Sequence, residues 1–445
     1  MIDKAPQLGI LYPHDARMSH GQASLAALQQ VIAMFIGCIT PALIFIAAVE
    51  LDTETQNYLI SMSLFTAGLG TFLQARRFGW IGSGLLSVNG TSFAYLDLLL
   101  RAGSEGGLAL ACGMALAAVP LQFILAFFLP SIRRILSPLV SGIVVLLIGL
   151  TLIPVAGYYI TYGLDSGQTW SQNLILAAPV AVVLILTQSL GKPLLKVAGP
   201  LLAIGLGYLI AASMGLLSLP EDTNKAFLIV PQPLYAGLAF KWELLLPFGI
   251  IYLVSSIEAI GDLTATANLS GIKTTGDDFW KRLRGGIFSD AITTTFACMI
   301  SVFPTATFSQ NNGVIQLTGV GARQVGYYIA AILIITGLLP QTGLLFSMIP
   351  KPVLGGATLV LFGLIAGAGF RMINQEKIGN REVLILSVSL GMAFGIPTQV
   401  AFVDSLPSVL AGILSSSVAT GGLTAVFLSL IFTNIKSKNT KIYRE

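Results

Sequence analysis

Three acidic residues lie within apolar stretches of the chain, and Asp97 lies at the edge of another. Glu258 and Asp262 are four residues apart, so they share one face of a helix, and Asp290 lies in the next apolar stretch. A charge is costly inside a bilayer, so such residues normally face a protein interior or a water path and mark function. We expect all three to bind a polar solute or to carry a proton. The alternative is a carboxyl group that only pins a neighbouring broken helix.

Amide side chains gather in another stretch, where Gln310, Asn311 and Asn312 are consecutive. A primary amide offers two donors and an acceptor with two lone pairs. That suits a flat heterocycle with alternating N–H and C=O groups, such as a purine dione. Glu258 would accept ring N–H groups with charge-assisted strength, and Phe93 would stack on the ring face. The same amides also hold membrane helices together, so that alternative stays open.

Other chemistries lack the residues they need. The two histidines, His14 and His20, precede the first apolar stretch, and there is no G-x-x-x-x-G-K-[ST] motif. Ser–His catalysis, H-E-x-x-H metal chemistry and direct use of ATP are therefore not expected. Cys38, Cys112 and Cys298 are scattered, which predicts neither a disulfide framework nor a metal site. We expect a secondary transporter, not an enzyme, with no cofactor, no metal and no nucleic-acid partner.

The composition predicts an all-α polytopic membrane protein. The 445 residues are 55% hydrophobic and 10% charged, whereas soluble domains carry about 25% charged residues. A bilayer core needs about 20 apolar residues per helix. Hydropathy predicts fourteen transmembrane segments, at 23–47, 57–75, 79–98, 106–128, 135–157, 172–189, 196–217, 243–266, 285–302, 308–322, 325–347, 353–372, 382–396 and 416–433.

The basic residues indicate the orientation. With the N-terminus inside, all but four of the 24 Lys and Arg residues fall in cytoplasmic segments, the exceptions being Arg101, Lys225, Lys241 and Lys351. This is the asymmetry that the positive-inside rule requires. We expect a multi-pass protein of the bacterial inner membrane with both termini, residues 1–22 and 434–445, in the cytoplasm.

Two segments resemble each other in opposite halves of the chain. SPLVSGIVVLLIGL begins at Ser137 and KPVLGGATLVLFGL at Lys351, with Pro and Gly residues recurring 214 positions apart. Seven spans separate them, which predicts a 7+7 inverted repeat over 23–217 and 243–433. The alternative is a chance match of Pro and Gly, which are common in such helices.

Two segments rich in Gly, Ser and Asn lie at corresponding places in the halves. GSGLLSVNGTSF (82–93) and FSQNNGVIQLTG (308–319) do not suit a continuous helix, because these residues favour local turns. We expect spans three and ten to be broken, with short strands as one alternative. Paired broken segments indicate a binding site at the midplane.

The motif QNNGVIQLTG (310–319) resembles the signature of the nucleobase–ascorbate transporter family, Q/E/P-N-x-G-x-x-x-x-T-R/K/G. GSGLLSVNGTSF, IEAIGDLTATA (257–267) and KPVLGGATLVLFG look like the bacterial xanthine permeases of this family. The resemblance runs along nearly the whole chain. It implies proton symport, homodimers, and a core domain (spans 1–4 and 8–11, about 23–128 and 243–347). The core would move, in an elevator-like or rocking manner, against a gate domain (spans 5–7 and 12–14, about 135–217 and 353–433).

The resemblance also implies roles for individual residues. Glu258 and Gln310 match positions that bind the base, and a glutamine at 310 is typical of the xanthine and urate branch. Positions important for activity match Asn311, Asp262 and Asp290, and positions that shape the pocket and its selectivity match Ser92, Phe93 and Gly319. Further candidates for the pocket are Gln30, Asn89, Thr91, Ser309 and Thr318.

This chain departs from the family at one informative place. Bacterial relatives usually carry His in the first span, where this chain has Gln29 and Gln30, and a glutamine cannot take a proton. Asn89 stands where close relatives often have Gln. We expect a proton-coupled importer of a purine base, xanthine above urate. The alternatives are a uracil or ascorbate carrier on the same scaffold and an anion exchanger. The exchanger would need fixed cations near the broken segments, where Arg323 is the only basic residue expected.

Overall fold

The computed structural model describes residues 10–132, 138–162, 170–190, 192–217, 227–374 and 378–442. The two predicted tails are therefore described from residue 10 and up to residue 442. Five basic residues that support the predicted orientation lie outside the described residues, namely Lys4, Arg133, Arg134, Lys377 and Arg444, and so does the exception Lys225.

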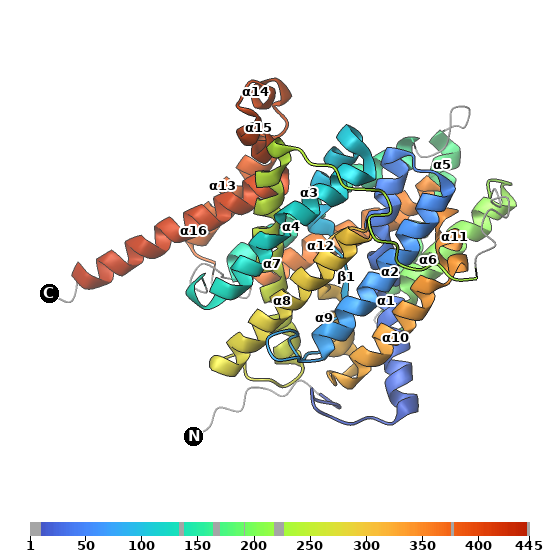
Figure 1. Cartoon of the computed structure of the whole chain (residues 1–445), viewed down its shortest axis with the longest axis horizontal. Helices are drawn as coiled ribbons and strands as arrows, with labels where there is room; N and C mark the ends of the chain where they lie inside the picture. Colours follow the sequence, from blue (N-terminus) through green and yellow to red (C-terminus); the bar gives the residue numbers. More distant parts are fainter. Residues whose placement is uncertain are drawn as a thin grey trace.

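Helices make up most of the described chain, and two strands and one short 3-10 helix lie between them (Figure 1). In chain order the elements are α1 (His20–Val49), α2 (Thr53–Ala75), β1 (Asn89–Thr91), η1 (Phe93–Tyr95), α3 (Leu96–Ile132), α4 (Pro138–Tyr162), α5 (Trp170–Ser189), α6 (Pro193–Ser213), α7 (Trp242–Leu269), α8 (Asp277–Met299), β2 (Thr305–Thr307), α9 (Ser309–Thr318), α10 (Gln324–Leu338), α11 (Pro340–Ser347), α12 (Lys351–Ile373), α13 (Asn380–Gly395), α14 (Val400–Asp404), α15 (Ser408–Leu414) and α16 (Ser417–Ile442).

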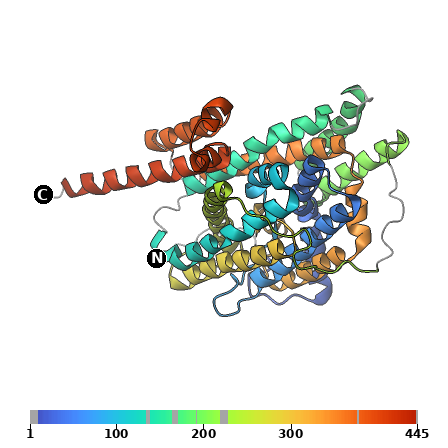
Figure 2. The same ribbon diagram turned by 45° about the horizontal axis from the view of Figure 1, so that its top comes forward.

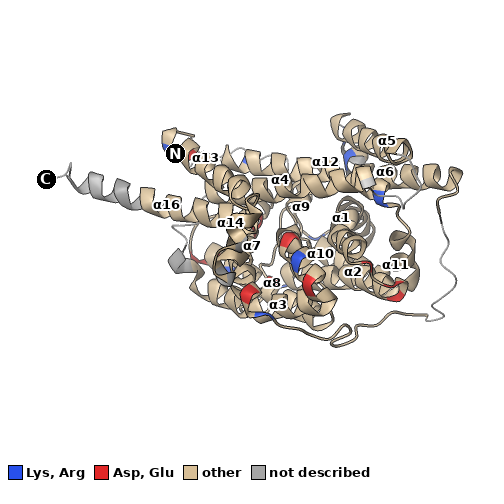
Figure 3. Ribbon diagram, turned by 90° about the horizontal axis from the view of Figure 1, so that it is seen from above, with Lys and Arg blue, Asp and Glu red and all other residues tan. Residues whose placement is uncertain are grey.

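Seven helices in the described part of the chain are long and apolar enough to cross a membrane. The pair α10 and α11 forms an eighth candidate, bent by 76°. Figure 3 shows few charged residues along the long helices. The chain is thus a multi-pass membrane protein, while the count of fourteen spans stays a prediction.

The third predicted span, 79–98, is largely non-helical. It begins beside an isolated bridge between Phe78 and Ile81 and continues as an extended segment, β1, η1 and the first residues of α3. Inside α3, Gly106 and Gly107 leave helical geometry, and Gly107 has a φ of 66° that glycine tolerates best. This break lies at the first two residues of the predicted fourth span, so the helical part before it extends past the predicted end of the third span.

The expectation that residues 308–319 cannot form a continuous helix is wrong. They contain the ten-residue helix α9, and the extended stretch β2 lies just before it. Asn residues weaken helices when their side chains bond their own backbone. Here Asn311 donates to the Leu86 carbonyl and Asn312 to the Asp262 carbonyl, so neither competes within α9.

Two other boundaries differ from the prediction. The predicted span 325–347 is two helices, α10 and α11, because Pro340 opens the second helix with a ring that has no N–H to continue the first. Residues 397–415, between two predicted spans, contain the short helices α14 and α15, which are too short to show a clear apolar period.

The helices form two groups. Figures 2 and 3 show α4, α5, α6, α12 and α13 along one side of the group formed by α1–α3 and α7–α11. The helices of the first group come from the segments predicted for the gate and those of the second from the segments predicted for the core, and the division into two domains stays a prediction.

The two similar segments pack against each other as α4 and α12. A Cβ placed on Gly149 would lie 2.4 Å from the Ala366 nitrogen, and one on Gly369 would lie 2.4 Å from the Leu146 nitrogen. Near the other end of the pair, a Cβ on Gly355 would lie 3.0 Å from the Ala156 oxygen. The contacts run in opposite directions along the two helices, so α4 and α12 are antiparallel, and their glycines permit the close approach.

Candidate functional site

The two strands join the halves of the chain at a short antiparallel pair, called here the strand junction. Its register pairs Asn89 with Thr307, Gly90 with Ala306 and Thr91 with Thr305. Hydrogen bonds of 2.9 Å from Ser92 N to Pro304 O and from Phe308 N to Val88 O extend the pairing. The junction therefore brings an extended chain from each half together inside the helix bundle.

Only glycine fits at the centre of this junction. A Cβ on Gly90 would lie 2.6 Å from the Cys38 Sγ of α1 and 2.7 Å from the Phe308 Cζ. Contacts this short force neighbouring atoms to move. The strand β1 can thus lie against α1 only because residue 90 has no side chain.

Helix α9 is tied to both of its neighbours by its asparagines. Asn311 Nδ2 donates to Leu86 O at 2.8 Å, which holds α9 to the extended segment before β1. Asn312 Nδ2 donates to Asp262 O at 3.3 Å, and its Oδ1 accepts from Thr266 Oγ1 at 2.6 Å. The start of α9 is thereby fixed against the middle of α7.

Asp290 lies behind the strand junction and is fully buried. Its Oδ1 accepts hydrogen bonds from Asn89 Nδ2 at 2.6 Å and from Gln74 Nε2 at 2.8 Å, and Gln74 Nε2 also donates to Gly286 O at 2.9 Å. One carboxylate on α8 therefore holds both α2 and β1. The sequence analysis missed Gln74, although an uncharged amide within the otherwise apolar end of α2 is a signal for it.

Glu258 and Gln310 differ from these neighbours. Both side chains are half-buried, and neither makes a hydrogen bond or ion pair with any residue that the structure describes. Glu258 interacts electrostatically with Asp262, one helical turn further along α7, and with Asp290. An acid and an amide are thus left open for a ligand in the region that the other polar groups hold in place.

The same turn of α7 faces the second group of helices. Ser141 Oγ of α4 donates to Ile257 O at 3.4 Å. A Cβ on Gly261 would lie 3.6 Å from the Ser141 Cβ and 2.7 Å from the Met372 Cε of α12. Glu258, between Ile257 and Gly261, therefore lies where the two groups meet.

Aromatic rings line this boundary. The ring of Phe93 lies 6.5 Å from that of Phe308 with an interplanar angle of 28°, and 5.8 Å from that of Phe362 on α12 with an angle of 83°. Phe93 thus packs between the strand junction and the second group of helices. Together with Glu258 and Gln310 it makes the candidate solute site.

The remaining candidates fall into two sets. Ser92 caps η1 by accepting from Ala94 N at 3.3 Å, and Thr91 and Gln30 are buried with side-chain oxygens that have no hydrogen-bond partner in the described structure. Ser309 is half-buried at the start of α9. Thr91 and Ser92 thus lie at the strand junction and Ser309 lies just after β2, whereas Gln30 is on α1, eight residues before the junction contact of Cys38.

Thr318 and Gly319 lie at the far end of α9. Nine residues of helical rise place Gly319 about 13 Å from Gln310. The Gly319 carbonyl accepts hydrogen bonds from Leu11 N and Tyr12 N, and Thr318 Oγ1 donates to Val314 O within α9. The structure therefore does not bring these two candidates to the solute site.

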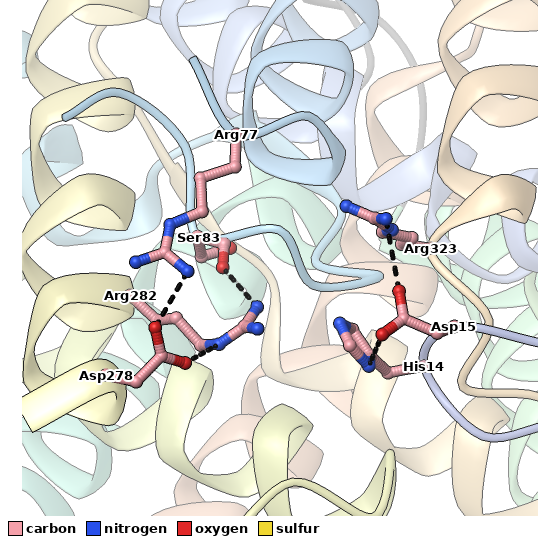
Figure 4. Close-up of polar contacts among 7 residues, drawn as sticks. All are labelled: His14, Asp15, Arg77, Ser83, Asp278, Arg282 and Arg323. Carbon is pink, nitrogen blue, oxygen red and sulfur yellow. Dashed lines mark hydrogen bonds and ion pairs between the residues drawn. The ribbon is translucent and has the colours of Figure 1, made fainter. Parts of the chain in front are cut away.

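One further expectation is corrected. Arg323 is not the only basic residue near the Gly-rich segments, because Arg282 Nη1 donates to Ser83 O at 3.2 Å (Figure 4). The two residues are 199 positions apart in the sequence. Their contact arises when the first turns of α8 pack against the segment that leads to β1.

Apolar helices that surround a partly open polar site define the chain as a membrane permease. A family model described as a permease family matches residues 21–402. The xanthine permeases XanP and XanQ of Escherichia coli strain K12 are 39% and 36% identical over 437 residues, which cover 95% of this chain and 94% and 93% of theirs. The uric acid permease PucJ of Bacillus subtilis strain 168 is 32% identical over 415 residues, 92% of each chain. This chain belongs to that permease family, the nucleobase–ascorbate transporters, which confirms the resemblance seen in its motifs.

Solved structures show the same fold at low identity. The transmembrane domain of the cyanobacterial bicarbonate transporter BicA matches with a TM-score of 0.59 and 14% identity, over 93% of this chain and 99% of that one. SLC26A9 matches with a TM-score of 0.62 and 15% identity, over 92% of this chain and 65% of that one. These similarities concern the fold alone.

Proposed function

We propose that this protein imports a purine nucleobase, xanthine foremost and urate next, into the cell by proton symport. The relatives named above are permeases for xanthine and uric acid, and the chain matches them over nearly their whole length. The observation that carries the proposal is the open pair Glu258 and Gln310, whose side chains have no partner in the described structure while neighbouring amide groups are engaged.

The chemistry of the open pair fits a purine dione. The Glu258 carboxylate accepts ring N–H groups, and the charge strengthens these hydrogen bonds. Gln310 offers both a donor and an acceptor to the ring edge. Phe93 supplies an apolar surface for the ring.

The proton binds in the carboxyl cluster around Glu258. Glu258 and Asp262 are one turn apart and interact electrostatically, so a proton on either reduces the repulsion between them. Asp290 engages two amide donors through one oxygen, and we assign it to positioning of the strand junction. Gln30 replaces the usual histidine and takes no proton.

Transport follows from the position of the site between the two groups of helices. The fourteen spans form two inverted sevens, and the core carries the base past the gate in an elevator-like or rocking motion. The antiparallel packing of α4 and α12 supports the inverted repeat. We assign the protein to the bacterial inner membrane as a homodimer with cytoplasmic termini.

The test is uptake of radiolabelled xanthine by cells that lack their own purine carriers and express this chain. We expect saturable uptake that excess urate reduces, that uracil, ascorbate and bicarbonate leave unchanged, and that a protonophore abolishes. Stronger competition by uracil or ascorbate than by urate would reassign the solute. Accumulation that persists without a proton gradient would refute symport.

A further inference from the structure

A pocket of about 490 Å³ lies away from the solute site, at the end of the molecule where the N-terminal segment packs. Three parts of the chain line it: residues 14–18, the residues Arg76 and Arg77 that follow α2, and the start of α10 at 323, 324 and 327. Pockets that bind small molecules commonly have volumes of about 300–1,000 Å³. The volume is therefore sufficient for a small organic anion.

The walls of this pocket carry an excess of positive charge. Four arginines line it, Arg17, Arg76, Arg77 and Arg323, against the single carboxylate of Asp15. Asp15 Oδ1 pairs with Arg323 Nη2 at 3.1 Å, and Asp278, outside the lining, pairs with Arg77 Nη1 at 2.9 Å (Figure 4). Arg17 and Arg76 have no carboxylate partner within the described structure.

The histidine in the wall, His14, adds little to this excess of positive charge. Burial lowers the pKa of His14, and Arg282 and Arg323 lower it further, although Asp15 acts in the opposite direction. The imidazole therefore carries less positive charge than an exposed histidine would, and its Nδ1 lies 3.1 Å from Asp15 Oδ2 in the pocket wall.

The first residues of helix α10 form part of the pocket wall. Helix α10 has fifteen residues, its N-cap is Arg323, and no side chain caps it. The first N–H groups of a helix point outward and carry a partial positive charge, which favours an anion. The uncapped start of α10 and the unpaired arginines therefore favour the same kind of ligand.

The walls are held in place by the protein itself. Met18 N donates to Gln324 Oε1 at 2.9 Å, and Arg323 N donates to His14 O at 3.0 Å. Gly321 N donates to Tyr12 O at 2.8 Å. The N-terminal segment is thus fixed along the start of α10, and the pocket does not depend on a ligand for its shape.

We propose that this pocket binds an anion that bears a phosphate group. Arginine recognises phosphate through paired N–H groups, and it is the residue preferred for this purpose. The phosphate belongs either to a soluble ester of nucleotide size or to the headgroup of an anionic lipid. A bound phosphate joins the N-terminal segment to α2 and α10 through Arg17, Arg76 and the start of α10.

The first arm of the test uses soluble probes with the purified full-length protein. Adenosine 5′-monophosphate is titrated by calorimetry, with adenosine as the control that lacks the phosphate. We expect adenosine 5′-monophosphate to bind and adenosine not to bind. The variant R17Q/R76Q, which changes two exposed arginines without ion-pair partners, should weaken binding at least about tenfold through the loss of charge-assisted hydrogen bonds.

The second arm uses lipid. The protein is placed in nanodiscs of phosphatidylcholine with or without phosphatidylglycerol, and bound phosphatidylglycerol is counted by native mass spectrometry. The matched control is K273Q/K281Q, which removes the same charge from exposed lysines outside the pocket. Phosphate-dependent binding in either arm that R17Q/R76Q weakens and K273Q/K281Q does not would support the pocket and identify its source. Absence of binding in both arms, or equal loss in the two variants, would overturn the proposal.

Discussion

At the scale of single residues, the candidate site contains two kinds of polar side chain. One kind makes hydrogen bonds within the protein, and the other has no partner and is available to a ligand. Asn311, Asn312 and Gln74 use their N–H groups on carbonyls or on Asp290. Glu258 and Gln310 make no such bond within the described structure. Both side chains are half-buried and have no partner in the described structure, so their polar groups are available to a ligand.

Glu258→Gln should remove most xanthine uptake. The change keeps the size of the side chain and removes the charge, and a hydrogen bond to a charged group contributes about 1.5–3 kcal/mol. The expected loss is about 10- to 150-fold in affinity for xanthine. The measurement is the concentration dependence of uptake at equal protein levels in the membrane.

The matched control for this change is Glu54→Gln, which neutralises an exposed acid in the first turn of α2. It should leave uptake within about twofold of the unchanged protein, as is usual for surface positions. Gln310→Ala should lower the affinity for xanthine in the same way as Glu258→Gln. Normal affinity in both site variants would place the solute elsewhere.

Asp290 allows positioning and proton transfer to be told apart. Asp290→Asn keeps an oxygen that accepts from Gln74 and Asn89, so we expect folded protein and substantial uptake. Asp290→Ala leaves those donors unpaired in a buried place, at a cost of about 1–3 kcal/mol for each. It should lower both the melting temperature and the amount of folded protein recovered. A well-folded Asp290→Asn variant without proton-coupled uptake would show that Asp290 carries the proton.

Some of these residues could be predicted from the sequence and others could not. Asp290 and Asn311 stand out because ionisable and amide groups are rare within apolar stretches. Gln74 also lies in an apolar stretch, but its role depends on Asp290, which lies 216 positions away, and that pairing cannot be seen in the local sequence. Gly319 matches the family motif, yet α9 carries it about 13 Å from Gln310, a separation that follows only once α9 is known to be helical.

At the scale of elements, the apolar runs predicted the positions of most long helices. The runs at 23–47, 57–75 and 243–266 lie within α1, α2 and α7. The strands were harder to place, because each has three residues and its partner is more than two hundred positions away. The periodicity of a three-residue strand carries little information, and the local sequence does not predict which distant segment a strand will pair with.

Gly90→Val tests the strand junction. The added side chain would overlap Cys38 and Phe308, and overpacking of this kind costs about 1–3 kcal/mol. We expect a lower melting temperature and reduced uptake. The control is Gly313→Ala on α9, where an added Cβ meets nothing within 4 Å, so the melting temperature should not fall. Equal effects of the two changes would argue against close packing at Gly90.

At the scale of the whole molecule, the candidate solute site lies where two groups of helices meet. Ser141 on α4 and Phe362 on α12 belong to one group, and Ile257 and Phe93 belong to the other. Beside Glu258, the hydrogen bond from Ser141 to Ile257 that joins the groups is long, at 3.4 Å. A boundary of this kind permits one group to move past the other while the interior of each stays packed.

A disulfide across this boundary tests the motion. The Ser141 Cβ and a Cβ at Gly261 would be 3.6 Å apart, within the range of about 3.5–4.5 Å that a disulfide needs. The native cysteines Cys38, Cys112 and Cys298 are buried, so they should not compete for the new thiols. Mass spectrometry of the linked peptides would verify that the bond forms in the variant S141C/G261C.

The most direct test of transport by movement of the core past the gate is xanthine uptake by S141C/G261C before oxidation, after oxidation and after reduction. We predict that oxidation stops uptake, that reduction restores it, and that S141C and G261C alone respond to neither treatment. Full uptake by protein in which the disulfide is shown to be complete would contradict the account.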